Sequence, residues 1–355
     1  MKNLLKYKGL LETNEVDAIL LTSEVNRFYA AEYNISEGVA IICRKRCYYF
    51  TDSRYIEAAE KNLPDFTVLM VDAAHPYVNR INDAIGENDV KVIGFEENYL
   101  TYAEYLLYSQ HLTAELIPYQ KPISAFREIK ENWELDLMRK AQDITDKTFA
   151  DMCKIIKPGK TEKELATELI YSLSKNGADG PAFSPIVITG SKTSMPHGVP
   201  GDKVVQEGDF VTMDFGAAYK GYCADMTRTV AVGYATEEMK KVYNTVLEAQ
   251  LAGLAATKAG VPGKDIDGAA RKVIVDAGYG AYFGHGYGHG VGIEIHEEPN
   301  PNPSNPNPMP VGAICSAEPG IYIPDKFGVR IEDVVIYTED GYENITHSPK
   351  ELIIL

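Results

Sequence analysis

The chain has 355 residues, 45% of them hydrophobic and 24% charged, which is typical of a globular protein with room for two domains. The net charge of −16 argues against a nucleic-acid partner, because phosphate binding needs a positive surface. No apolar run could cross a bilayer, and the N-terminus lacks the apolar region of a signal peptide, so we expect a cytoplasmic protein with no membrane partner. The five scattered cysteines predict reduced thiols and no zinc site.

Residues 1–123 alternate between short apolar runs and helical patterns, which predicts an α/β domain. Residues 16–21 and 91–95 are expected to be buried strands. Residues 38–50 are expected to form a hairpin that turns at Arg44 to Arg46. No polar cluster in this domain demands chemistry.

A second domain, residues 124–355, is predicted after a linker at residues 119–124. It begins with an amphipathic helix that ends at Pro158, followed by a helix with a Thr161–Glu164 capping box. Three strands come next, and then another pair of helices and further strands. The expected helices are 132–157, 161–177, 236–258 and 264–277, and the first three strands are 184–189, 209–215 and 222–232.

The second domain repeats one pattern, in which a strand enters from a glycine, carries an acid near its end, and has another glycine two residues on. A second acid follows on the strand expected to be the hairpin partner. We interpret this as an internal duplication, against the alternative that glycine and acid recur by chance. The two copies are Gly208, Asp214, Gly216 and Asp225, and Gly312, Glu318, Gly320 and Glu332.

Three histidines (His285, His289 and His296) fall within a stretch, residues 284–299, that is interrupted by glycines and cannot be a regular helix. A phosphate-binding loop is excluded, because no strand–loop–helix unit with a G-x-G-x-x-G register surrounds the stretch. The His-Glu-x-x-His signature of zinc proteases is also missing.

The acids of the repeat have apolar neighbours, as at Asp214 and Glu332, and buried charges without partners are costly. One explanation is that each acid sits at an edge or turn and faces water. The other is that the acids bind cations. Imidazole and carboxylates without thiolate suit Mn²⁺, Co²⁺ or Zn²⁺, and four acids supply enough oxygens to bridge two ions about 3.5–4 Å apart.

These segments resemble the pita-bread metallopeptidase family, which contains methionine aminopeptidase, aminopeptidase P and prolidase. The resemblance covers the chain from about Glu131 to the C-terminus. It implies an α/β (α+β) fold, in which a creatinase-like N-terminal domain precedes a pseudo-duplicated pita-bread catalytic domain. The N-terminal domain is typical of the proline-specific branch. The matching motifs are 213–216 (MDFG), 224–229 (ADMTRT), 288–292 (GHGVG), 318–322 (EPGIY) and 330–333 (RIED).

The resemblance implies two divalent metal ions, with Mn²⁺ expected first and Co²⁺ or Zn²⁺ as alternatives. Asp214 would bind one ion, Asp225 and Glu332 would bridge both, and His289 and Glu318 would complete the second. A water held between the ions would act as hydroxide on the carbonyl before proline. Glu318 would carry the proton to the leaving prolyl nitrogen.

The resemblance also implies roles for four further residues. His296 and His197 match histidines that bind substrate and steady the tetrahedral intermediate, and both are candidate catalytic residues. His285 is expected to line the proline pocket. Arg330, two residues from Glu332, is expected to orient that acid.

The expected substrates are peptides with proline in second position. Many prolidase-like members carry an arginine after His-Glu-x-Pro that grips the carboxylate of a dipeptide, but here the position is Asn300, in the Asn/Pro-rich loop 299–310. We therefore expect an Xaa-Pro aminopeptidase, with an Xaa-Pro dipeptidase as the alternative. A non-catalytic peptide-binding module is the more remote alternative. The resemblance further implies a homodimer.

Overall fold

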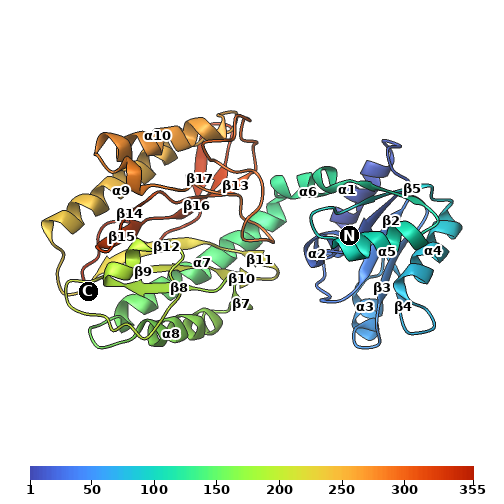
Figure 1. The fold of residues 1–355 in the computed structure, drawn as a ribbon, viewed down its shortest axis with the longest axis horizontal. Helices are drawn as coiled ribbons and strands as arrows, with labels where there is room; N and C mark the ends of the chain where they lie inside the picture. Colours follow the sequence, from blue (N-terminus) through green and yellow to red (C-terminus); the bar gives the residue numbers. More distant parts are fainter. The chain divides into compact units, whose positions relative to one another are not determined.

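The structure is a computed structural model that describes residues 1–355. The chain divides into two compact units, Met1–Phe126 and Arg127–Leu355 (Figure 1). None of the helices combines the length and apolar character that a membrane span requires.

The first unit is built on a six-stranded sheet with the order β4-β3-β2-β1-β5-β6. The predicted hairpin is confirmed, since β2 and β3 pair antiparallel, and β1 joins them to the parallel strands β5 and β6. Strands β1, β2 and β3 are buried along their whole length, as their apolar sequences require. The elements of this unit are α1 (Lys2–Leu11), β1 (Ala18–Leu21), α2 (Glu24–Ala31), β2 (Val39–Cys43), β3 (Cys47–Thr51), α3 (Ile56–Asn62), β4 (Thr67–Met70), α4 (Tyr77–Asn88), β5 (Val92–Phe95), α5 (Tyr102–His111) and β6 (Glu115–Pro118).

The segment expected to be a linker differs in the structure, because most of it begins a helix, α6 (Gln120–Glu128). Pro122 lies in the first turn of α6. A proline is tolerated there, since the first amide groups of a helix have no acceptor within the helix.

The second unit contains the predicted duplication. One half has helices α7 and α8 and the sheet β12-β9-β8, and the other has helices α9 and α10 and the sheet β13-β16-β17. Figure 1 shows α9 and α10 on one side of the central strands and α8 on the other. The elements are α7 (Asn132–Ile155), α8 (Glu162–Lys175), β7 (Gly180–Pro181), β8 (Ile186–Thr189), η1 (Gly190–Ser194), β9 (Phe210–Phe215), β10 (Ala217–Tyr219), β11 (Tyr222–Cys223), β12 (Met226–Ala231), α9 (Glu237–Ala256), α10 (Gly263–Asp276), η2 (Gly280–Tyr282), β13 (Ile314–Ala317), β14 (Gly320–Ile323), β15 (Phe327–Arg330), β16 (Asp333–Tyr337) and β17 (Tyr342–Asn344).

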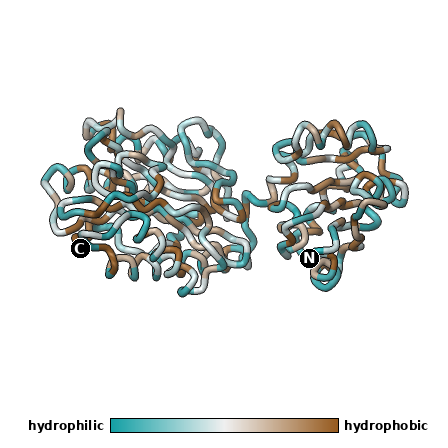
Figure 2. Tube along the Cα trace, turned by 60° about the horizontal axis from the view of Figure 1, so that its bottom comes forward, coloured by the Kyte–Doolittle hydropathy of each residue, from teal (hydrophilic) through white to brown (hydrophobic).

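Each half of the second unit has its own hydrophobic core. The first core packs α7 and α8 against β9 and β12, through residues such as Leu169 and Met213. The second packs α9 and α10 against β13, β15 and β16, through residues such as Val246 and Val335. In Figure 2 the most hydrophobic stretches of this unit, in brown, run mainly through its interior. The predicted capping box is present, because Thr161 accepts from the amide of Glu164 and the Glu164 side chain accepts from the amide of Thr161.

The predicted strand 222–232 is divided in the structure into β11 and β12. The two residues between them are Ala224 and Asp225, so this acid lies at an interruption of the strand. In the second half Glu332 likewise lies between two strands, β15 and β16. The fold thus places the second acid of each copy where a strand is broken.

Candidate metal centre

The duplicated strands bring the four acids of the repeat to one place. Asp214, near the end of β9, is opposite Thr227 on β12, and Asp225 directly precedes β12. In the other half Ala317, beside Glu318, is opposite Asp333 on β16. The halves are joined here by a hydrogen bond of 3.1 Å from the amide of Glu332 to the carbonyl of Thr227.

The glycine-rich segment reaches the same place by lying along β13. The amide of Ser316 donates to the carbonyl of His289 at 2.8 Å, and the amide of Glu318 donates to that of Tyr287 at 2.7 Å. Gly288 has to be glycine for this approach, because a Cβ there would lie 2.0 Å from the carbonyl oxygen of Ser316. His289 is therefore held against the strand that leads to Glu318.

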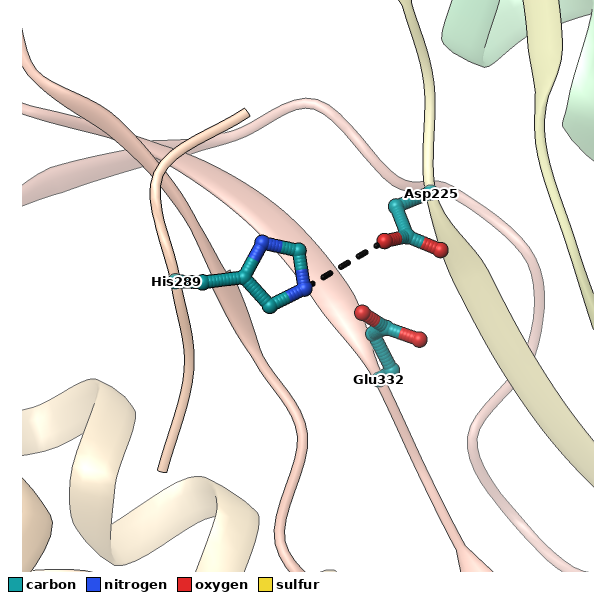
Figure 3. Close-up of side chains that lie close together, drawn as sticks. All are labelled: Asp225, His289 and Glu332. Atoms are coloured by element: carbon teal, nitrogen blue, oxygen red, sulfur yellow. Dashed lines mark ion pairs between the residues drawn. The ribbon is translucent and has the colours of Figure 1, made fainter. Parts of the chain in front are cut away.

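Asp225, His289 and Glu332 form the centre of the site (Figure 3). One candidate ligand atom from each lies within 4.8 Å of the others. His289 Nε2 is 3.6 Å from Asp225 Oδ2 and 3.2 Å from Glu318 Oε1. Asp225 Oδ1 and Glu332 Oε1 are buried and have no hydrogen-bond partner.

The pKa values of the acids indicate that this cluster would favour a bound cation. Burial and repulsion between the carboxylates raise the pKa values of Asp225 and Glu332 well above their usual range. Burial would also raise the pKa of Glu318, but its hydrogen bond and charge interaction with His289 hold it at about 2. Burial would lower the pKa of His289, but Glu318 raises it to about 9.

These residues fit a divalent metal centre. Buried oxygens without a hydrogen-bond partner are rare in proteins, and this site contains two of them, Asp225 Oδ1 and Glu332 Oε1. Carboxylate oxygens with one imidazole and no thiolate suit Mn²⁺, Co²⁺ or Zn²⁺, and such a cation would offset the repulsion between the acids.

Asp214 belongs to a neighbouring network of hydrogen-bonded side chains. Arg330 Nη2 donates to Asp214 Oδ2 at 2.6 Å, and Arg330 Nη1 donates to the Tyr322 hydroxyl at 2.8 Å. That hydroxyl is 2.9 Å from Nε2 of His285. Burial lowers the pKa of His285 and, against the effect of Arg330, raises that of Asp214.

The structure connects Arg330, which was expected to orient Glu332, to that acid through Thr227. Arg330 Nε donates to the Thr227 hydroxyl at 2.9 Å, and that hydroxyl donates to Glu332 Oε2 at 2.7 Å. Arg330 holds Asp214 directly and reaches Glu332 only through Thr227.

All of the residues singled out from the sequence line one cavity of about 1040 Å³. His296 lies beside His289, with the two ring centroids 4.3 Å apart. Burial and the nearby charge of His289 lower the pKa of His296. The predicted residues on the cavity wall are His197, Asp214, Asp225, His285, His289, His296, Glu318, Arg330 and Glu332.

Asn300 lies on the wall of the same cavity. Its Oδ1 accepts a hydrogen bond of 3.1 Å from the amide of Gly290, beside His289. The loop that follows is tied to the start of α10, where the amide of Lys264 donates to the carbonyl of Asn305 at 2.8 Å. The Asn/Pro-rich loop is therefore anchored at this point.

Three polar residues that contact the predicted site residues were not assigned a role from the sequence. Thr227 bonds Glu332, Ser316 Oγ donates to Glu318 Oε1 at 3.0 Å, and Tyr322 joins Arg330 to His285. Thr227 and Tyr322 lie inside the motifs quoted above, and that position is the signal that could have identified them. Ser316 had no such signal.

Comparison with known proteins agrees with this geometry. Residues 136–339 match the metallopeptidase family M24, and residues 4–129 match the creatinase/prolidase N-terminal domain. The "Uncharacterized peptidase YqhT" of Bacillus subtilis is 40% identical over 351 residues, which cover 99% of each chain.

Two solved structures have the same fold over nearly the whole chain. An Xaa-Pro dipeptidase from Bacillus anthracis is 41% identical with a TM-score of 0.95, covering 100% of this chain and 99% of its own. An X-Pro aminopeptidase from Thermotoga maritima is 35% identical with a TM-score of 0.90, covering 96% and 98%. The chain therefore belongs to metallopeptidase family M24, with a creatinase/prolidase N-terminal domain ahead of a pita-bread catalytic domain.

Proposed function

We propose that this protein is a metal-dependent Xaa-Pro dipeptidase, which hydrolyses the bond before proline in dipeptides. The observation that carries the hydrolytic part is the buried cluster of Asp225, His289 and Glu332, with its unpartnered oxygens, on the wall of a large cavity. The dipeptidase part is supported by the relative of that name from Bacillus anthracis. This replaces the aminopeptidase as the leading hypothesis, because the comparisons favour the alternative.

Asp214, Asp225, His289, Glu318 and Glu332 would hold two divalent ions. When bound, the ions polarise the peptide carbonyl and acidify water near neutral pH. We expect Mn²⁺ to be the most effective ion, with Co²⁺ and Zn²⁺ as alternatives, because an all-nitrogen-and-oxygen site accepts each of them.

Glu318 would move the proton. Its carboxylate, 3.2 Å from His289 and on the cavity wall, would accept a proton from the attacking water. As the bond between the carbonyl carbon and the prolyl nitrogen breaks, Glu318 returns that proton to the nitrogen, which leaves as an amine.

The cavity histidines would bind the substrate around the reacting carbonyl. The lowered pKa of His296 favours a neutral imidazole, which can donate one N–H to the carbonyl oxygen as negative charge develops on it. His197 lies on the same wall, and His285, fixed by Tyr322, would contact the proline ring.

An Xaa-Pro aminopeptidase is the second candidate. Asn300 stands where prolidase-like proteins carry the arginine that binds the carboxylate of a dipeptide, and its amide bonds the backbone at Gly290. The Thermotoga maritima relative bears the name X-Pro aminopeptidase. Both candidates use the same catalytic residues and differ in the length of the peptide accepted.

The deciding experiment compares Ala-Pro with Ala-Pro-Ala, using protein stripped with chelator and reloaded separately with Mn²⁺, Co²⁺ and Zn²⁺. A higher kcat/KM for the dipeptide supports the proposal, and a higher value for the tripeptide supports the aminopeptidase. Metal binding without cleavage of either peptide contradicts both. No metal binding and no cleavage would favour a non-catalytic peptide-binding module. The homodimer and the cytoplasmic location stay predictions.

A further inference from the structure

Glu297, the neighbour of His296, is a buried carboxylate that the proposed reaction does not use. Its side chain is 2% exposed, as is that of Lys130, whose Nζ lies 3.2 Å from Glu297 Oε2. Arg127 Nη1 lies 3.4 Å from Glu297 Oε1. Two cations from the start of this unit thus meet an acid beside a candidate catalytic histidine, with Lys130 167 residues from Glu297 in the sequence.

Ion pairs with Arg127 hold the segment that carries His296 at both of its ends. Arg127 Nη2 donates to Glu294 Oε2 at 2.7 Å, and the amide of Glu294 donates to Glu297 Oε1 at 3.0 Å. Glu294 and Glu297 are therefore both tied to Arg127, and Ile295 and His296 lie between them on the cavity wall.

Glu297 also reaches the segment that carries His289. The amide of Glu297 donates to the carbonyl of Gly290 at 2.8 Å, and the amide of Gly290 donates back at 3.0 Å. Gly292 leaves room for the carboxylate, since a Cβ there would lie 2.4 Å from Glu297 Oε2. The backbone and side chain of Glu297 together set how the two histidine-bearing segments face one another.

Stability alone is a weak reason for such an arrangement. Replacing a buried ion pair by apolar residues is often neutral or stabilising, because desolvation offsets the attraction between the charges. A fixed geometry is a better reason, since a buried charge has few alternative partners. The position of His296, 4.3 Å from His289, is the geometry that these pairs restrain.

We propose that Glu297, held by Lys130 and Arg127, is a positioning residue for His296. Glu297 keeps the imidazole of His296 beside His289, where the proposed function requires it to donate to the reacting carbonyl oxygen. This inference rests on the proposed function for its catalytic consequence, but the restraint on His296 is a property of the protein by itself.

The test uses the Zn²⁺-loaded protein and the variants E297Q, H296A and E297Q/H296A. We expect E297Q to lower kcat for the better substrate about tenfold or more, with KM and metal content little changed. In the H296A background, E297Q should cause no further loss, because it acts through His296. Lys130→Met removes the other partner of the Lys130–Glu297 ion pair, and it replaces E297Q in the test if E297Q does not fold.

A matched control is E343Q, which removes the exposed ion pair with Arg139 and should leave kcat unchanged. The second readout is the NMR signal of the His296 imidazole, identified as the signal missing from H296A. E297Q should shift or broaden this signal, whereas E343Q should not.

An equal loss of kcat from E297Q in both backgrounds, or an unchanged His296 signal, would overturn the proposal. If the wild type cleaves no Xaa-Pro peptide, the proposed function fails separately, and the His296 signal alone decides the positioning role. A moved signal then supports the restraint, and an unmoved one contradicts it.

Discussion

Replacing Asp225 by Asn should make the chelated protein more stable while removing most of its response to metal. Asp225 is 4% exposed and its Oδ1 has no hydrogen-bond partner. Burial and the nearby acids raise its pKa well above the usual range, so the carboxylate is a source of unfavourable energy unless a cation is bound. An amide of the same shape carries no charge and so removes the repulsion with Glu332.

The magnitude follows from the buried groups concerned. A buried polar group without a partner costs about 1–3 kcal/mol, and more when it is charged, so removing the charge of Asp225 and its repulsion with Glu332 should raise the free energy of unfolding by about 1–3 kcal/mol. Each kcal/mol corresponds to about 2–4 °C in the unfolding midpoint of a domain of this size. In the wild type, metal at a hundred times its Kd should add about 2.7 kcal/mol, and D225N should lose most of this increment.

The assay is thermal unfolding of wild type and D225N in chelator, followed by titration with Mn²⁺. The matched control is D209N, because the carboxylate of Asp209 accepts from Thr189 Oγ1 at 3.1 Å and from the amide of Gln206 at 3.0 Å. D209N should lower stability and keep the metal response. The reasoning is refuted if chelated D225N unfolds below chelated wild type, or if it keeps the full metal-dependent rise.

Three further predictions concern the cavity and the first unit. Asn300→Arg should raise the ratio of kcat/KM for Ala-Pro over Ala-Pro-Ala about tenfold, by binding the dipeptide carboxylate; an unchanged ratio would mean that position 300 does not contact it. Glu96→Gln should cost about 2–3 kcal/mol in denaturant unfolding, because this fully buried carboxylate accepts bonds from the backbone and hydroxyl of Ser23 at the start of α2; no loss would contradict this account. Burial would raise the pKa of Asp17, but hydrogen bonds from the Lys91 backbone and from Arg44 lower it overall, so its stabilising effect is present above its unfolded pKa of about 3.9 and is lost as pH falls through the lower folded value. The stability difference between wild type and D17N should therefore shrink between pH 6 and pH 3, and a constant difference would exclude this origin.

The secondary structure of this protein could be predicted from the sequence where the signal is local. The hairpin formed by β2 and β3, the capping box at Thr161 and the paired helices of each half all depend on residues within a few positions of one another. The helix α6, which begins within the expected linker, was not predicted, because a proline in the first turn of a helix and one in an extended segment look alike in sequence.

The candidate ligands could be found from the sequence because motif and repeat mark them, and their roles as ligands stay predictions. The hydrogen-bond and ion-pair partners of these residues could not be found from the sequence. Arg330 was expected to orient Glu332, and only the structure shows that it binds Asp214 directly and connects to Glu332 through Thr227. Thr227, which joins Arg330 to Glu332, is 105 residues from the acid that it contacts.

The sequence by itself therefore determined the order of the elements, the duplication and the residue types of the site. Only the tertiary structure decided which charges meet, as with Lys130 and Glu297, or Arg330 and Asp214. The physical reason is that hydrophobic periodicity and capping act over a few residues, whereas a buried charge is stabilised by whichever partner the packed strands bring within about 3 Å.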